Sequence, residues 1–374
     1  MRGSRFHAFL CVLLSAFILL TGCAGSAHPS PEKPLSEEPL SGEPSAGEQT
    51  SGEPAAETER PIYDEPEDGH MQLIPDTAFT QGMNLITQKN HADGDAFSVF
   101  AVRDFRGNPA AGLTPLWRLC QWDSGPDLSG MLAQSDPREI TDGEFRTFRY
   151  DPAEDVMTFR LDTSLYYGGM PAREGDYWPH LLIEAPSFGC ETLPPDRAEY
   201  YLCDADSLTV SFDIRLTEFE AEPVEGDWVS AVQFLLYFYV KGVGTPDFCW
   251  FGLQLFDSRW PRNDHYTGYD GGKADASGAM IFSVGSKYIY ADAGGSALWQ
   301  NGAPSPDGVW RHVELDLVPY LKLMLKRGQA DGYFRADDLS GLKIDGMNVG
   351  WETIGTFRHT MELRGLRLTS ARDR

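Results

Sequence analysis

The stretch Leu208-Thr209-Val210-Ser211-Phe212-Asp213-Ile214-Arg215-Leu216 decides the fold class of this chain. Apolar and polar side chains alternate along it residue by residue, which is the pattern of a strand with one buried and one solvated face. The same alternation returns at 312–317, where Val313, Leu315 and Leu317 share a face. A last strand is predicted over 362–368, with Gly365 marking a β-bulge.

Other segments complete the same architecture. The runs 232–240 and 249–256 are almost continuously apolar and aromatic, which predicts strands covered on both faces. Only 319–327 is typical of a helix, with Pro319 in its first turn and Gly328 as its stop signal. Many strands, many Gly and Pro turns and one short helix predict an all-β fold, a two-sheet sandwich or jelly roll.

The N-terminal region predicts export. Arg2 and Arg5 precede an apolar run that ends at Leu20-Thr21-Gly22-Cys23, and this run is too short to span a membrane comfortably. The order of basic, apolar and small residues predicts a signal peptide over 1–22. Leu-Thr-Gly-Cys also resembles the lipobox of bacterial lipoproteins, which implies that Cys23 is acylated, for example with palmitate, and becomes the new N-terminus. The alternative is an ordinary signal peptide with a chance cysteine.

Residues 23–69 are built mostly of Pro, Glu, Ser, Gly and Ala. Such a segment cannot bury enough apolar surface to offset the entropy of ordering, so we expect a disordered acidic tether. A pro-peptide or a binding tail is the alternative. Residues 70–374 are then the β-sandwich domain, held outside the cell membrane by the lipid.

Charge and cysteine usage narrow the function classes. The chain has 56 acidic and 31 basic residues and a net charge of −25, and no basic cluster, which argues against nucleic-acid binding. Beyond Cys11 and Cys23 there are four cysteines, without the spacing of a zinc site. An exported location permits disulfides, and Cys190 with Cys203 would close a short loop; free buried thiols are equally compatible with the sequence.

Five segments carry a resemblance to known proteins. They are Trp178 to Glu184, Trp250 to Asp257, Asp270 to Gly278, Gly308 to Glu314 and Gly346 to Glu352. The chain resembles an uncharacterised family of secreted or lipid-anchored gut-bacterial proteins, and this resemblance brings no catalytic residues with it. At the level of fold it is similar to the concanavalin-like jelly rolls of glycan-binding modules and glycoside hydrolases, and a shared fold does not fix a function.

Saccharides present flat C–H faces and rings of hydroxyl groups, so their sites combine aromatic rings with planar polar side chains. Period-two alternation puts Gln233, Tyr237, Tyr239 and Lys241 on one face of a strand, and Trp250 and Gln254 on one face of the next. A following aromatic loop adds further candidates. The predicted glycan-binding residues are Trp250, Gln254, Tyr237, Gln233, Arg259, Trp260, Tyr266 and Tyr269. The alternative is that these aromatic side chains fill the core.

Catalysis is the main alternative function, as a glycoside hydrolase or polysaccharide lyase. Hydrolysis needs two carboxyl groups about 5–10 Å apart. Glu184, with His180 on the same strand face, is the catalytic candidate; otherwise Glu184 caps a sheet edge. The other candidate carboxyl groups are Asp257, Glu314 and Glu352.

No catalytic motif is present in the sequence, which favours binding of an oligosaccharide or polysaccharide without catalysis. A protein-binding adhesion or envelope scaffold is a third hypothesis. No cofactor is required by any motif. Calcium is the one conceivable ion, with Asp264, Asp270 and Asp275 as oxygen ligands, although their spacing is not that of an EF-hand.

Overall fold

The computed structural model describes residues 66–86, 99–101, 105–107, 114–120, 136–143, 145–164, 166–173, 176, 178–222, 224–271, 277–291, 297–301 and 303–372. All of them belong to one contact unit, Glu59–Arg374. The predicted signal peptide, Cys23 and nearly all of the tether lie outside the described residues.

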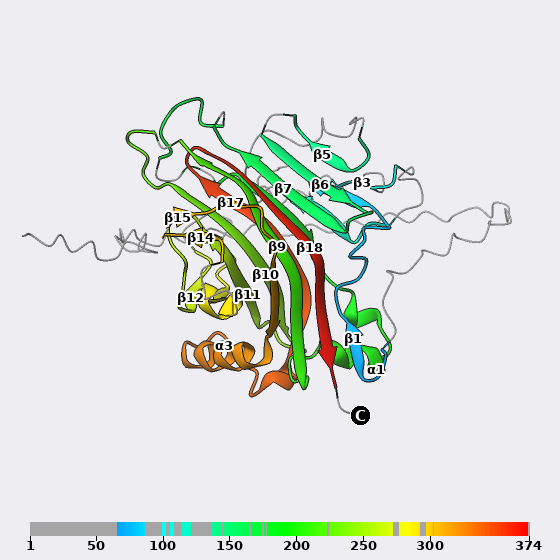
Figure 1. Cartoon of the computed structure of the whole chain (residues 1–374). Helices are drawn as coiled ribbons and strands as arrows, with labels where there is room; N and C mark the ends of the chain where they lie inside the picture. Colours follow the sequence, from blue (N-terminus) through cyan, green and yellow to red (C-terminus); the bar gives the residue numbers. More distant parts are fainter. Residues whose placement is uncertain are drawn as a thin grey trace, which may run out of the picture. The chain divides into compact units, whose positions relative to one another are not determined.

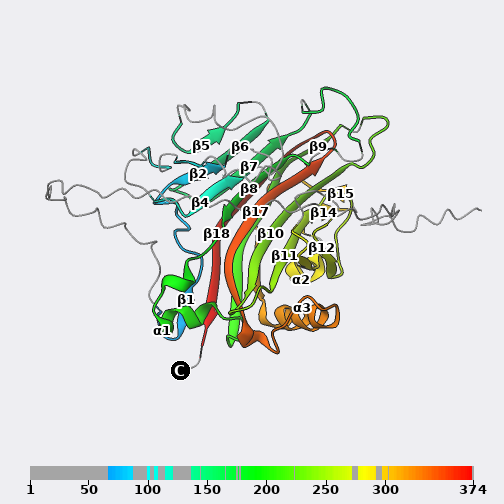
Figure 2. The same cartoon turned by 180° about the vertical axis from the view of Figure 1, so that it is seen from behind.

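Two large antiparallel-rich sheets make up the described chain (Figures 1 and 2). The first has seven strands in the order β16-β9-β18-β7-β6-β5, with β1 paired to β18. Its strands are β1 (His70–Gln72), β5 (Glu139–Thr141), β6 (Arg146–Asp151), β7 (Val156–Asp162), β9 (Ser207–Ala221), β16 (Arg311–Asp316) and β18 (Phe357–Ala371).

The second sheet has nine strands in the order β12-β13-β11-β10-β17-β8-β4-β2-β3. Its strands are β2 (Met83–Ile86), β3 (Val99–Ala101), β4 (Trp117–Cys120), β8 (His180–Ala185), β10 (Ala231–Gly242), β11 (Phe248–Asp257), β12 (Tyr266–Tyr269), β13 (Met280–Val284) and β17 (Leu342–Ile354). A small hairpin joins β14 (Trp299–Gln300) to β15 (Ala303–Pro304).

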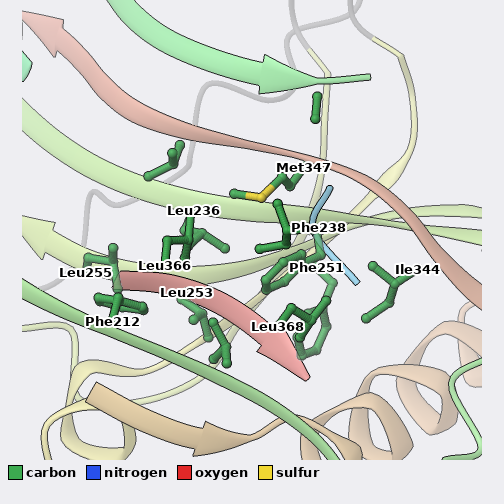
Figure 3. Close-up of a cluster of buried hydrophobic side chains, with 14 of the residues drawn as sticks. Phe212, Leu236, Phe238, Phe251, Leu253, Leu255, Ile344, Met347, Leu366 and Leu368 are labelled. Atoms are coloured by element: carbon green, nitrogen blue, oxygen red, sulfur yellow. The ribbon is translucent and has the colours of Figure 1, made fainter. Parts of the chain in front are cut away.

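Side chains from both sheets meet in one apolar core (Figure 3). Phe212 of β9 and Leu368 of β18 come from the seven-stranded sheet, and Leu236 of β10 and Phe251 of β11 come from the nine-stranded sheet. Alternate residues of each long strand enter this layer, as the sequence pattern requires. The predicted all-β two-sheet sandwich is therefore confirmed.

The helical segments of the described residues are α1 (Pro195–Ala198), α2 (Ser286–Ile289), α3 (Val318–Ala330) and the 3₁₀ turns Cys190–Thr192, Glu199–Tyr201 and Leu339–Gly341. Apart from α3, these segments are single turns. The predicted helix is α3, but it continues past Gly328, so the stop signal was wrong. Gly328 is buried inside the helix, where a Cβ would lie 2.1 Å from the Phe334 ring, so its small size serves packing.

Most strand predictions are confirmed, with small changes at their ends. The strand predicted at 312–317 ends at Asp316, and Leu317 is the N-cap residue that precedes α3. The bulge at Gly365 is present: the β18–β9 register shifts between Arg364 and Arg367, and Gly365 has φ +63°. The expectation that β10 is covered on both faces was wrong in part, since Gln233 and Tyr237 are only half-buried.

The cysteines of the described chain, Cys120, Cys190, Cys203 and Cys249, are all buried free thiols, so the alternative without disulfides holds. Burial raises the pKa of Cys190 to about 11 and that of Cys203 and Cys249 further, so these thiols stay protonated. Within the described residues no helix has both the length and the apolar character needed to cross a membrane.

Candidate functional site: the outer face of the nine-stranded sheet

The two faces of the sandwich that point away from the core differ in chemistry. On the seven-stranded sheet, charges of opposite sign alternate between neighbouring strands. One cross-strand row runs Arg215, Glu362, Thr158, Arg149 and Glu139. The charged side chains of this face pair with one another, as Arg215 does with Glu362, which is the ordinary behaviour of a solvated sheet surface.

The outer face of the nine-stranded sheet is its face away from the core. Within the described residues it has fewer cross-strand ion pairs than the seven-stranded sheet. One cross-strand row passes over eight strands, from β12 to β2. It runs Tyr266, Ser283, Gly252, Tyr237, Asn348, Glu184, Arg118 and Asn84. Aromatic, amide and charged side chains thus lie side by side across the sheet, which is the mixture that a polyhydroxylated ligand requires.

An aromatic cluster stands next to this row on β10 and β11. The half-buried Trp250 ring meets Tyr239 edge-on at 4.8 Å and Phe248 at 4.9 Å between ring centroids, and Tyr237 at 6.3 Å. The indole Nε1 donates a hydrogen bond to Ser277 Oγ at 3.1 Å, and Ser277 is held by Asp270. The indole is therefore fixed from two sides while part of it stays accessible.

Two glycines let the tyrosine rings lie flat on the sheet. A Cβ on Gly252 would come within 2.3 Å of the Tyr237 ring, and a Cβ on Gly346 within 2.7 Å of the Tyr239 ring. Tyr237 therefore extends over β11 toward Ser283, and Tyr239 extends over β17 toward β8. The rings form a low aromatic floor instead of standing up from the sheet.

Glu184 is the centre of a buried polar network. Arg118 Nε lies 2.5 Å from Glu184 Oε2, and the Tyr239 hydroxyl donates to Glu184 Oε1. Cys120 Sγ donates to Oε2 at 3.2 Å, and Asn348 Nδ2 donates to the Tyr239 hydroxyl at 3.2 Å. Both carboxylate oxygens are thus occupied by the protein itself.

The electrostatics of this network favour fixed protonation states. Burial opposes the charge of Arg118, but the hydrogen bond and charge of Glu184 outweigh it and raise its pKa. Burial, together with the negative charge of Glu184, raises the pKa of Tyr239 and of Cys120 well above their ordinary values. Tyr239 therefore remains a hydrogen-bond donor, and Cys120 remains a thiol.

A second polar cluster lies at the end of β11 around Asp257, whose side chain is fully buried. Arg259 donates to it from Nε at 2.8 Å and from Nη2 at 2.7 Å, and Arg262 donates from Nε at 2.9 Å. Gln233 and Gln254 donate at 2.9 and 3.2 Å. Burial alone would raise the pKa of Asp257, but the Arg259 hydrogen bond and the charges of both arginines lower it.

The exposed Trp260 ring lies against both of these arginines. The Cζ atoms of Arg259 and Arg262 are each 5.0 Å from the ring centroid. Among the predicted residues, Gln233, Gln254, Arg259 and Trp260 are thus brought into one cluster, and Tyr237 and Trp250 into the aromatic one. Tyr266 reaches the outer face on the edge strand β12, whereas Tyr269 has the opposite side-chain direction on that strand.

Glu184 has no other candidate carboxyl group close to it, whereas Asp257 and Glu352 both pair with Gln233 from the two strands that flank β10, about 10 Å apart across the sheet. Glu314 lies on the seven-stranded sheet, and Asp257 is enclosed by its donors. Glu352 pairs with His180, while Glu184 pairs with Asn348, four residues away along β17, or about 13 Å. Glu184 also turns toward Tyr239, whose ring covers Gly346, and therefore away from Glu352. This spacing exceeds the separation that glycoside hydrolysis needs.

The predicted calcium ligands have other contacts. Asp264 lies 3.0 Å from Lys287 Nζ, Asp270 accepts from Ser277, and Asp275 lies outside the described residues. In the described part of the chain no three His, Cys, Asp or Glu side chains gather closely enough to hold a metal ion. A role for calcium stays a prediction.

Comparisons with known proteins return likeness in structure only. No family model matches the chain, and no curated protein sequence matches it. A family 12 xyloglucanase from Bacillus licheniformis is 9% identical, with a TM-score of 0.34, over 63% of this chain and 91% of that one. A family 11 xylanase from Neocallimastix patriciarum is 6% identical, with a TM-score of 0.33, over 60% and 85% of the two chains.

A third structure is the xyloglucanase domain of a type three effector from Sinorhizobium fredii, in complex with cellobiose. It is 8% identical, with a TM-score of 0.31, over 62% of this chain and 96% of that one. Similarity at this level carries over no activity, substrate or site residue.

Sequence reasoning missed several members of the site. Arg262 stood in the aromatic loop without a role, and Arg118 and Asn348 were not singled out at all. Arg118 lies in the four-residue strand β4, which is too short for a clear alternation signal. Their importance depends on strand order, because Arg118, Glu184 and Asn348 come from three neighbouring strands that are far apart in sequence.

Proposed function

We propose that this protein is an exported, lipid-anchored bacterial surface protein that binds an extracellular saccharide on the outer face of its nine-stranded sheet, without hydrolysing it. The observation that carries the proposal is the half-exposed Trp250, held edge-on by Tyr239 and Phe248 and flanked by the polar row from Tyr237 to Arg118. Rigid aromatic rings beside oriented hydrogen-bonding groups suit a ligand with apolar ring faces and hydroxyl edges.

Two features support binding without hydrolysis. Glu184 accepts hydrogen bonds at both oxygens, from Arg118 and Tyr239, so its carboxylate already has a structural role in the buried network. Its register places it about 13 Å along the sheet from Glu352. A hydrolase would have to use carboxyl groups other than this pair.

The binding proposal is tested by affinity electrophoresis of the full chain in gels that contain single neutral or acidic polysaccharides. We expect at least one polysaccharide to retard the protein. Trp250→Ala should lower the affinity about tenfold or more, because it removes the rigidly held ring on which the sugar would stack. Trp310→Ala is the matched control, since Trp310 lies on the seven-stranded sheet side between Arg215 and Arg364.

Two outcomes would overturn this proposal. One is that no gel retards the protein, although the same preparation unfolds cooperatively and is therefore folded. The other is that Trp250→Ala and Trp310→Ala lose equal amounts of affinity for the polysaccharide. Release of reducing sugar from a retarding polysaccharide would replace binding by hydrolysis, and its persistence in Glu184→Gln would place the chemistry elsewhere.

The anchor rests on Leu20-Thr21-Gly22-Cys23 and the acidic segment behind it. We expect the full chain to sediment with the membrane fraction. Cys23→Ser should abolish lipid labelling, because the Cys23 sulfur is the atom to which the lipid would be attached. Cys120→Ser, which changes a buried thiol of the sandwich, is the control. Lipid labelling that survives Cys23→Ser would contradict the anchor.

A further inference from the structure

Arg259 and Arg262 share a single carboxylate. Asp257 takes two hydrogen bonds from the Arg259 guanidinium and one from Arg262 Nε. Within the described residues, no ion pair joins either arginine to a second acid. Two guanidinium groups and one carboxylate are therefore in direct contact at this end of the outer face, and the next carboxyl group, that of Glu352, faces Gln233 from β17.

The chain provides its own comparison on the other sheet. Arg215 and Arg364 lie over Trp310, with Cζ 4.2 and 4.4 Å from the ring centroid. Each of these arginines has its own carboxylate, Glu362 for Arg215 and Asp213 for Arg364. On the seven-stranded sheet the two guanidinium groups beside the indole thus have one carboxylate each, whereas around Trp260 the two guanidinium groups share one.

The hydrogen-bonding capacity of Arg262 is only partly used. A guanidinium carries donors on Nε and on both terminal nitrogens. In the described structure Arg262 Nε donates a hydrogen bond to Asp257, and the two terminal nitrogens of Arg262 have no hydrogen-bond acceptor. Its side chain is 15% exposed, so these donors are partly desolvated but still border solvent. Such donors bind a planar oxyanion more strongly than fully hydrated ones.

We propose that Arg262, positioned by Asp257 and supported by Arg259, binds the acidic group of an anionic saccharide, with a uronic-acid carboxylate as the expected ligand. This inference rests on the proposed saccharide binding and names its ligand class. The exposed indole of Trp260 lies within reach of the same guanidinium groups and offers an apolar surface to the sugar ring.

The distance to the aromatic cluster sets the size of the ligand. Trp250 pairs with Tyr239 and Asp257 pairs with Gln233, six residues apart along β10, which is about 20 Å. One sugar ring cannot touch both places. A ligand that contacts the Trp250 cluster and Arg262 at once is therefore an oligosaccharide or a polysaccharide.

The test compares acidic and neutral polysaccharides in affinity electrophoresis of the full chain. The probes are polygalacturonate, hyaluronan and alginate for carboxylates, dextran sulfate for sulfates, and galactan and dextran as neutral polymers. Because the net charge of the chain is −25, non-specific attraction to a polyanion is not expected. We expect retardation by a carboxylated polymer that weakens as salt is raised.

Three variants assign the effect. Arg262→Gln should weaken binding to the acidic polymer about tenfold or more, because a charge-assisted hydrogen bond is lost. Arg262→Lys keeps the charge beside Asp257 and protects the fold, but it removes the planar fork and should weaken binding severalfold. Arg364→Gln changes one of the two arginines beside Trp310 and should leave binding unchanged.

Each other outcome has a separate meaning. Retardation by neutral polymers alone would overturn the acidic ligand while leaving saccharide binding intact. Retardation by dextran sulfate but by no carboxylated polymer would overturn the uronate assignment. If Arg262→Lys and Arg262→Gln bind the carboxylated polymer as tightly as the wild type does, Arg262 does not bind the acidic group. No retardation in any gel would overturn the proposed function itself.

Discussion

Tyr239 of β10 hydrogen-bonds to Glu184 of β8, although β17 lies between these two strands. The contact is possible because Gly346 of β17 leaves room for the tyrosine ring to cross. One small residue thus connects the aromatic cluster to the Arg118–Glu184 ion pair.

Gly346→Ala should lower the free energy of unfolding by about 2–4 kcal/mol. The new Cβ would lie 2.7 Å from the Tyr239 ring and 2.8 Å from the Pro186 carbonyl oxygen, at a residue with φ +122°. Gly244→Ala is the control, with φ +68° and no atom within 4 Å, and should cost about 1 kcal/mol. Urea titrations of both variants measure the difference; equal losses would mean that the Tyr239 contact is unimportant.

Gly328→Ala should destabilise α3, although alanine normally favours a helix interior over glycine by about 0.5–1 kcal/mol. The reason is that the Phe334 ring occupies the position of the added Cβ, at 2.1 Å. In a Phe334→Ala background the same substitution should become stabilising. Unfolding free energies of the four proteins form a double-mutant cycle. A coupling energy near zero would show that the ring moves aside freely.

Stability should fall in acid through His359. Burial lowers the pKa of this ring to about 3, so it is neutral in the folded state. The unfolded chain takes up a proton below about pH 6.5. The stabilisation is therefore complete above about pH 6.5 and is lost as the pH falls toward 3, by at most about 1.4 kcal/mol per pH unit.

Urea titrations at pH 7 and pH 5 measure this loss. His359→Leu should reduce the difference between the two pH values, whatever its effect at pH 7, because the titrating ring is removed. Gly244→Ala, which changes no titrating group, should leave the difference unchanged. The prediction fails when the wild type and His359→Leu respond to acid equally.

Asp257→Asn should lower the unfolding free energy by about 3–5 kcal/mol, because it leaves the largely buried guanidinium groups of Arg259 and Arg262 without their shared charge. Glu362→Gln, which breaks the Arg215 pair on the more exposed sheet, should cost about 0–1 kcal/mol. Chemical denaturation compares the two. Similar small losses would show that Asp257 does not hold the Arg259–Arg262 loop together.

The alternation in 208–216 was enough to predict the fold class, because a period of two is a local property of the chain that directly separates core from solvent. The same rule correctly placed Gln233, Tyr237, Tyr239 and Lys241 on one face of β10. It did not predict the length of α3, since the end of that helix depends on how Phe334 packs against Gly328.

Only the tertiary structure decided which side chains on these faces come together in one site. Strand order brings Arg118, Glu184 and Asn348 onto adjacent strands, and this order follows from long-range pairing that no local pattern encodes. Side-chain direction decided the rest: Tyr239 crosses β17 only because residue 346 is glycine, and Asp257 draws in both Arg259 and Arg262 only because it is buried at the end of β11. Sequence by itself therefore determined the sandwich and its faces, whereas packing determined the site.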